Sequence, residues 1–150
     1  MKYVAAAFIS LLPLSAFAHD YEINGLKVEH PIAKATTETA RASAGYLSIT
    51  NTGETVDHLV GVEADFPRVM VHDTIVEDGV ASMMHMDSIA LEPGQTVVFE
   101  PGGLHVMFMG LSEQLIEGQK IPGTLIFENA GRLDIEFNVE HVDSDAHAHH

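Results

Sequence analysis

The residues of this sequence with the clearest chemistry are histidine and methionine, and they gather in one stretch, residues 68–110. That stretch holds three of the 10 histidines and six of the 7 methionines, and the chain contains no cysteine. Imidazole nitrogen and thioether sulfur are neutral, moderately soft donors, and this is the ligand set expected for monovalent copper. The stretch therefore predicts a copper site.

The overall composition narrows the function classes. Without cysteine the chain has no thiol catalysis, no disulfides and no thiolate metal site. Asp and Glu total 22 against 7 Lys and Arg, which gives a net charge of -15. Such a surface repels phosphate backbones and anionic headgroups, so we expect neither nucleic-acid binding nor membrane insertion of the mature chain. Cations and basic protein surfaces are the partners that it favours.

The first 18 residues have the pattern of a signal peptide. Lys2 is followed by an apolar run from Tyr3 to Leu14, and the segment ends in Ala16-Phe17-Ala18, which is typical of a signal peptidase site. The apolar run is too short to span a bilayer comfortably. We expect a signal peptide over residues 1–18, export to the periplasm and a mature chain from His19; a retained membrane anchor is the alternative.

Short apolar runs separated by Gly, Pro and Asn residues fill the rest of the chain. This pattern predicts an all-β, antiparallel Greek-key β-sandwich over residues 19–141, as one domain and a monomer. Only Ser112 to Gln119 could form a helical turn. The nine expected strands are Ile23 to His30, Ala44 to Thr50, His58 to Ala64, Arg68 to Val76, Ala81 to Met86, Thr96 to Glu100, His105 to Met109, Leu125 to Glu128 and Leu133 to Val139.

The dipeptide Asp78-Gly79 lies between two of these runs and is a strong hairpin signal. A two-residue turn there pairs His72 with His85 and Thr74 with Met83. Because side chains alternate along a strand, these four residues are expected on one face. His72 and Met83 are then diagonal neighbours that one ion could join.

The run from His105 to Met109 places its histidine and both methionines on one face by the same alternation. If this face opposes that of the hairpin at one end of the sandwich, a pocket of four His and Met ligands closes. A slip of one residue in the register would turn a whole set of these side chains away.

The spacing of four donors carries a family resemblance. His72, 10 intervening residues, Met83, 21 more, His105, one more and Met107 resemble the metal motif of the periplasmic PCu(A)C copper chaperones. The segments HDTIVEDGV and LEPGQTVVFEPGGLHVMFMG and the leader resemble that family too. The resemblance implies a cupredoxin-like sandwich that binds one Cu(I) through these four side chains. It also implies copper delivery for cytochrome c oxidase assembly, to a copper-accepting oxidase subunit directly or through a Sco-type thiol protein.

The remaining donors of the stretch receive weaker assignments. Met70 and Met109 are expected to fill the core, the usual role of methionine in a β-sandwich. His85 shares the ligand face in the expected register, so it is a partner of a ligand or an alternate ligand. Met84 and Met86 are expected to point to the other side.

The C-terminal segment is a second candidate for metal binding. His147, His149 and His150 stand among Asp and Ala, and we expect a flexible tail over residues 142–150. Divalent copper prefers imidazole and carboxylate to thioether, so the tail could capture Cu(II) beside a Cu(I) site in the core. An inert solvated end or an expression remnant is the alternative.

The sequence therefore predicts a periplasmic copper-binding protein that holds and transfers an ion and is not an enzyme. Without thiolates, or an open metal position beside a positioned base, we find no residues suited to turnover. Two other classes stay open: a small copper oxidoreductase, and a metal-free β-sandwich used for adhesion or assembly.

Overall fold

Eleven strands make up the regular structure of residues 20–143, the part of the chain that the computed structural model describes. No helix in this part is long and apolar enough to cross a membrane. The expected signal peptide and the histidines His147, His149 and His150 lie outside the described residues. The strands are β1 (Tyr21–Ile23), β2 (Leu26–Lys34), β3 (Ala42–Asn51), β4 (Asp57–Ala64), β5 (Arg68–Glu77), β6 (Val80–His85), β7 (Ile89–Leu91), β8 (Thr96–Phe99), β9 (His105–Met109), β10 (Lys120–Phe127) and β11 (Gly131–Glu140).

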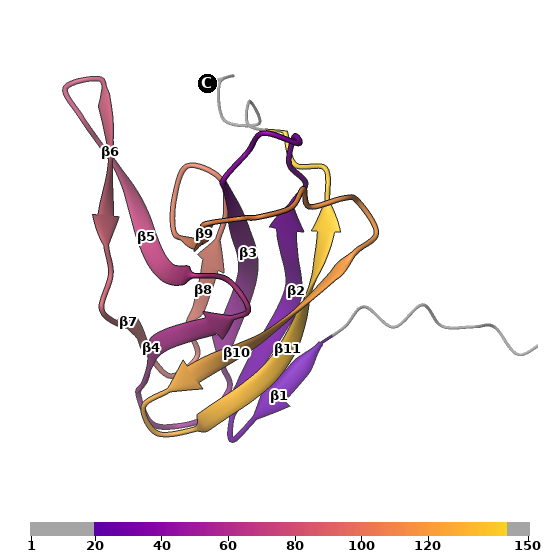
Figure 1. Ribbon diagram of the computed structural model, residues 1–150. Helices are drawn as coiled ribbons and strands as arrows, with labels where there is room; N and C mark the ends of the chain where they lie inside the picture. The colour runs from indigo at the N-terminus through magenta and orange to yellow at the C-terminus, as the bar shows by residue number, and fades with distance from the viewer. Residues whose placement is uncertain (1–19, 144–150) are drawn as a thin grey trace, which may run out of the picture.

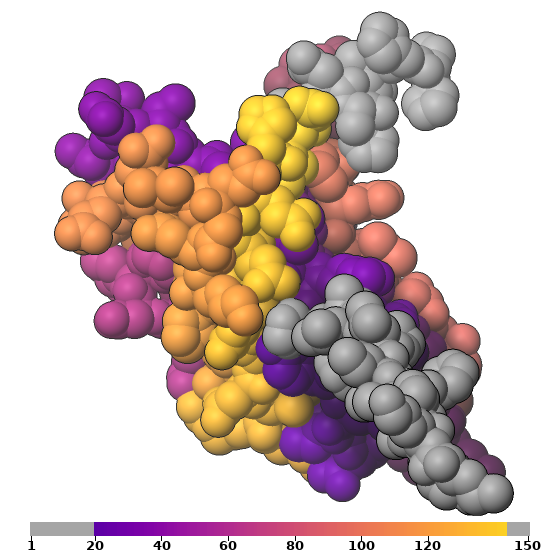
Figure 2. All heavy atoms as spheres, turned by 90° about the vertical axis from the view of Figure 1, so that its right-hand side faces the viewer, coloured from indigo at the N-terminus to yellow at the C-terminus, as the bar shows by residue number. Residues whose placement is uncertain are grey.

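One hydrogen-bonded path connects the strands in the order β6-β5-β9-β3-β2-β11-β10-β4-β7, with β1 added to β2 and β8 added to β3. Only β2 and β11 pair in parallel among the described strands. Figure 1 shows the path curling so that β4, β10 and β11 lie over the strands of its other half. In the view turned by 90°, the yellow β11 runs between orange and indigo segments (Figure 2). The expected all-β, cupredoxin-like fold is confirmed.

The two halves of the path meet in an aromatic core. Phe108 of β9 packs edge-on against Phe137 of β11 with ring centroids 5.3 Å apart, and both side chains are fully buried. Gly45 of β3 makes room for them, because a Cβ atom there would lie 2.9 Å from Cε2 of Phe108. Burying a large apolar side chain contributes about 1.5–3 kcal/mol. The core thus fixes which face of β9 points inward.

The apolar pattern located every long strand, and each expected run is a strand in the structure. It did not separate β1 from β2, which are joined by a turn at Asn24-Gly25, and it did not predict β7. The helical turn expected over Ser112 to Gln119 is wrong, since this segment forms bends and turns. Its Leu115 is anchored by its backbone N–H, which donates to Oγ1 of Thr36 at 2.9 Å.

Two prolines lie inside strands that were expected to exclude them. At Pro31 the ladder between β2 and β3 shifts register between Glu29 and Ile32, and such an irregularity accommodates proline. Pro122 lies in β10, which begins at Lys120 and not at Leu125 as expected. It pairs only with β11, because the ladder between β10 and β4 starts at Gly123. In both strands the missing N–H falls where the ladder is interrupted or one-sided.

β6 stands at one end of the path and pairs only with β5. All six of its residues are exposed. Figure 1 shows the β5–β6 hairpin extending away from the body of the sandwich. This hairpin carries two of the donors identified in the sequence, Met83 and His85.

Candidate metal centre

The hairpin has the register predicted from its turn. Asp78 and Gly79 have φ values of 52° and 77°, as a two-residue turn with both central residues in the left-handed region requires. His72 pairs with His85, and Thr74 pairs with Met83. The short-range prediction is therefore confirmed.

The position of β9 differs from the expected arrangement. β9 is the direct neighbour of β5 in the same sheet, with His72 paired to His105 and Met70 paired to Met107. The expectation that the hairpin and β9 present opposing faces is wrong. Their donors converge because paired residues of neighbouring strands project side by side from one face.

We use the name donor face for this surface of β6, β5 and β9. Its middle row is His85, His72 and His105, one from each strand in that order. On one side of this row Met83 lies beside Thr74, and on the other side Met70 lies beside Met107. The alternate residues Val71, Val106 and Phe108 are buried in the core. The donor face thus points away from the core, and His72 lies at its centre.

Each neighbouring pair of imidazoles in the middle row is spaced as two ligands of one ion would be. The ring centroid of His72 is 5.9 Å from that of His105 and 5.9 Å from that of His85. Both ring pairs are nearly perpendicular, at 85° and 88°. With metal–nitrogen distances of about 2 Å, two imidazoles on one ion have centroids about 5–6 Å apart. Either pair therefore has a separation suited to coordination.

His105 is the most buried of these histidines, at 5% exposure. Its Nδ1 lies 3.0 Å from the carbonyl oxygen of Gly103, which can only accept, so Nδ1–H donates there. The other ring nitrogen, Nε2, is buried and has no hydrogen-bond partner. Nε2 therefore carries an unsatisfied lone pair, and a ring held by a bond from its other nitrogen is typical of a metal-ligating histidine.

The surroundings of His72 favour its neutral form. Burial lowers the pKa of its imidazole, and the neighbouring His105, His85 and Arg68 lower it further. Its Nε2 lies 2.9 Å from Sδ of Met70, while its Nδ1 is buried without a partner. A neutral imidazole is the form that binds metal, so this environment favours coordination.

Met70 was expected in the core, but it is only partly buried and lies on the donor face. It lies two residues before His72 on the same strand, so strand alternation alone would have placed both on one face. Met109 lies further along β9 and pairs with Arg68. Met84 pairs with Asp73 and so faces away from the donor face, as expected.

Three of the four motif residues line one hollow of about 200 Å³, namely Met83, His105 and Met107. Met83 is 59% exposed, so its sulfur is accessible from solvent. Among residues 20–143, no group of three or more His, Cys, Asp or Glu side chains is placed to hold a metal. An ion bound here would have to use methionine sulfur.

His85 completes the middle row on the hairpin side. Its side chain is about half exposed, and its Nε2 lies 3.0 Å from Oδ1 of Asp87. Because a carboxylate accepts, this contact orients the ring and places the proton on Nε2. The second nitrogen, Nδ1, is then available as a donor to a metal.

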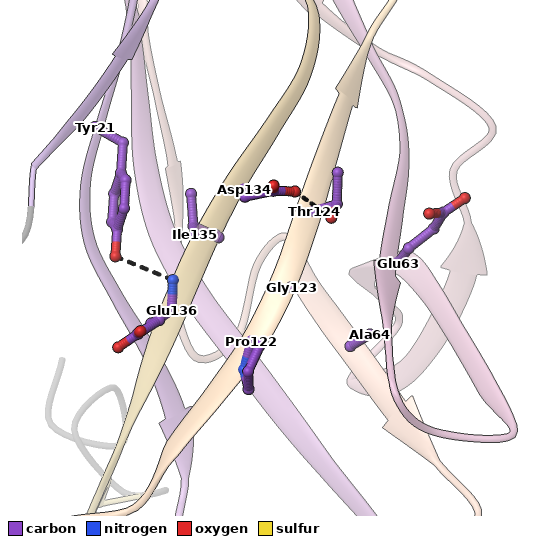
Figure 3. Close-up of a pocket in the computed structure, with 9 residues that line it drawn as sticks. All are labelled: Tyr21, Glu63, Ala64, Pro122, Gly123, Thr124, Asp134, Ile135 and Glu136. Carbon is purple, nitrogen blue, oxygen red and sulfur yellow. Dashed lines mark hydrogen bonds between the residues drawn. The ribbon is translucent and has the colours of Figure 1, made fainter.

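A larger hollow lies elsewhere, lined by residues of β1, β4, β10 and β11 (Figure 3). Its volume is about 570 Å³, and its lining includes three carboxylates. Glu63 is paired with Arg132, Asp134 accepts from Oγ1 of Thr124 at 2.8 Å, and Glu136 lies 3.6 Å from Nζ of Lys120. Each carboxylate has a partner within the protein, so this hollow has no set of free donors comparable to that of the donor face.

The fold, together with a face of histidine and methionine, defines a cupredoxin-like domain of the PCuAC type. The structure is similar to the copper-bound PCuAC domain from PmoF2, with a TM-score of 0.70 and 32% identity over 83% of this chain and 99% of that chain. The apo PCuAC domain from PmoF1 gives a TM-score of 0.71 and 29% identity over 83% of this chain and 100% of that chain. The CuI-DR1885 structure from Deinococcus radiodurans is similar in fold, with a TM-score of 0.57 and 23% identity over 83% of each chain.

The sequence comparisons give the family. Residues 26–139 match the family model described as "Putative lipoprotein LpqE-like". The "Putative lipoprotein Lxx21020" of Leifsonia xyli subsp. xyli (strain CTCB07) is 32% identical over 131 residues, which is 86% of this chain and 78% of that protein. The chain therefore belongs to the LpqE-like family.

Proposed function

We propose that this protein is an exported copper-binding protein that holds one Cu(I) through His72, Met83, His105 and Met107 and transfers it to an acceptor without catalysing a reaction. The single observation that carries the proposal is the buried Nε2 of His105, which lacks a partner and lines the same hollow as the two methionines. A buried polar atom without a hydrogen bond is rare in folded proteins. A bound ion would satisfy it.

The donor set favours a soft monovalent ion over hard cations. Two imidazoles and two thioethers are neutral and polarisable, whereas Ca²⁺ and Mg²⁺ require oxygen ligands. The similar PCuAC domain from PmoF2 is copper-bound, which supports copper as the metal. The absence of thiolates suits transfer, because thioethers bind more weakly than thiolates and release the ion more readily.

The destination of the copper is also part of the proposal. The resemblance to the PCu(A)C chaperones supports delivery for the copper centres of cytochrome c oxidase, to an oxidase subunit or a Sco-type protein. The signal-peptide pattern of residues 1–18 supports export to the periplasm, as do the relatives described as lipoproteins. The net charge of -15 favours an acceptor with a basic docking surface.

Anaerobic titration of the protein with Cu(I) against a competing chelator tests the site. We expect one Cu(I) per chain, with the affinity about 10- to 100-fold lower in Met83→Leu and in Met107→Leu. Leucine keeps the volume and removes the sulfur, so the fold is retained. The matched control is Met84→Leu, the next residue on β6, which faces the other side and should keep the wild-type affinity. If Met83→Leu and Met107→Leu bind Cu(I) as tightly as Met84→Leu and the wild type, the assignment is excluded.

The C-terminal tail is proposed as a separate Cu(II) ligand through His147, His149 and His150. The supporting observation is that Val142, at the start of this segment, lines the same hollow as Met83 and His105. Imidazole and carboxylate suit divalent copper. Truncation after Val142 should remove Cu(II) uptake and leave Cu(I) affinity unchanged; a truncated protein that takes up Cu(II) as before would contradict this part.

A further inference from the structure

We use the name inner site for the proposed ligand set of His72, Met83, His105 and Met107. Two donors of the donor face lie outside it. Met70 precedes His72 on β5 and pairs with Met107, and His85 lies opposite His72 on β6. Both line a second hollow of about 200 Å³, together with Asp87. This hollow shares no lining residue with the hollow of Met83, His105 and Met107.

Two side-chain contacts orient the donors of this region. Oδ1 of Asp87 lies 3.0 Å from Nε2 of His85, and a carboxylate that accepts from one ring nitrogen orients the ring and makes the other nitrogen a better donor. Sδ of Met70 lies 2.9 Å from Nε2 of His72. The ring of His72 is equally distant from His85 and His105, with 5.9 Å between centroids in each pair.

We propose that Met70 and His85, sharing His72 with the inner site, form an outer copper position through which copper enters and leaves. This inference rests on the proposed function. Two imidazoles and one thioether are soft neutral donors like those of the inner site, so the same ion can occupy either position. The transfer is a ligand exchange without change of oxidation state: His72 stays bound while His85 and Met70 are replaced by His105 and the inner methionines.

Exposure gives the direction of this path. The side chain of His85 is about half exposed, whereas His105 is 5% exposed. An ion arriving from solvent or from a partner therefore meets His85 before it meets His105. A direct path past Met83, which is 59% exposed, is the competing route, and the two routes predict different effects of the same substitutions.

The kinetics of copper removal distinguish the routes. We would load each protein with one Cu(I) and follow its removal by excess bicinchoninate under anaerobic conditions. The rate should fall about tenfold in His85→Ala and in Met70→Leu, while the equilibrium affinity stays close to that of the wild type. Met84→Leu, a neighbour of His85 that faces the other side, should leave both quantities unchanged.

Three outcomes would overturn the outer position. Unchanged removal rates in His85→Ala and Met70→Leu would show that copper uses the direct path. An affinity loss as large as that of Met107→Leu would make His85 an inner ligand. A wild-type protein that fails to bind one Cu(I) would remove the proposed function and this inference together, whereas normal binding with unchanged rates would remove only the inference.

A structural measurement on a double variant tests the position itself. Met83→Leu/Met107→Leu removes both sulfurs of the inner site but keeps Met70. With methionines labelled at the ε-methyl carbon, adding Cu(I) to this variant should shift the NMR signal of Met70, and the further substitution His85→Ala should abolish that shift. A Met70 signal that does not move with Cu(I), at copper concentrations where the histidine signals do, would contradict the proposal.

Discussion

Two hollows in the described part of the chain differ in their chemistry. The larger one, of about 570 Å³, is lined by carboxylates that are paired with neighbouring side chains (Figure 3). The smaller one, of about 200 Å³, lies on the donor face, where Nε2 of His105 and Nδ1 of His72 are buried without partners. Polar atoms that the fold leaves unsatisfied therefore point to a binding site more directly than volume does.

The energetics of polar groups explain why this contrast is informative. Leaving a buried donor or acceptor without a partner costs about 1–3 kcal/mol. In the larger hollow that cost does not arise, because its carboxylates are exposed to water and also paired with neighbouring side chains. On the donor face the fold accepts the cost at two imidazoles, and an ion that binds them would remove it.

The largest expected effect is on copper affinity when a donor is removed. His105→Ala should lower the Cu(I) affinity about a hundredfold, because a buried ligand is lost and water cannot replace it well. Asp134→Asn in the larger hollow should leave the affinity unchanged. Both are measured by anaerobic chelator competition, with circular dichroism to confirm the fold. Similar losses in the two variants would remove the distinction between the hollows.

The next effect concerns the stability of the aromatic core around Phe108 and Phe137. Gly45→Ala should lower the free energy of unfolding by about 1–3 kcal/mol, because the added Cβ would overpack the rings of Phe108 and Phe137. Urea denaturation measures it. The matched control is Gly61→Ala, also in a strand, where the new Cβ would meet Ile126 at an ordinary 3.4 Å. Equal destabilisation in the two variants would contradict the argument.

A change in the turn of the β5–β6 hairpin should lower the Cu(I) affinity with little effect on the free energy of unfolding. Asp78→Pro cannot adopt the observed φ of 52° and should disrupt the turn of the β5–β6 hairpin. Because all six residues of β6 are exposed, the free energy of unfolding should change by less than about 1 kcal/mol. The Cu(I) affinity should nevertheless fall about tenfold, since Met83 is displaced. Retained affinity would show that the hairpin supplies no ligand.

The smallest effect is a pH dependence of the copper-free protein. Burial lowers the pKa of His72 in the folded state below its value of 6.5 in a model compound. Below about pH 6.5 the unfolded chain takes up a proton that the folded chain does not, so stability falls as the pH decreases toward the folded pKa. Urea denaturation between about pH 7.5 and 5.5 should show this, and His72→Gln should weaken the dependence. The same slope in the variant would assign it to other groups.

Local patterns in the sequence predicted the strands and the hairpin well. Asp78-Gly79 determined the pairing of His72 with His85, because a two-residue turn leaves one register between its strands. Alternation along β9 likewise placed His105 and Met107 on one face. Each of these inferences involves residues close in the chain.

Pairing between distant segments could not be predicted in the same way. The neighbour of β5 on its other side is β9, and no short-range signal links His72 with His105. Opposing faces were therefore expected where the structure has a single face, and Met70 was assigned to the core. The larger hollow was not predicted for the same reason, since Tyr21, Glu63 and Glu136 come from three separate strands.

The two-residue turn of the hairpin has a consequence for how the metal preference of this protein could be altered. β6 and the residue after it include the run Met83-Met84-His85-Met86. A loop one residue longer that shifted the pairing by one step would bring Met84 opposite Thr74 and Met86 opposite His72. The hairpin would then offer two sulfurs in place of one sulfur and one imidazole, so a register shift of one residue would convert a mixed donor surface into one enriched in thioethers.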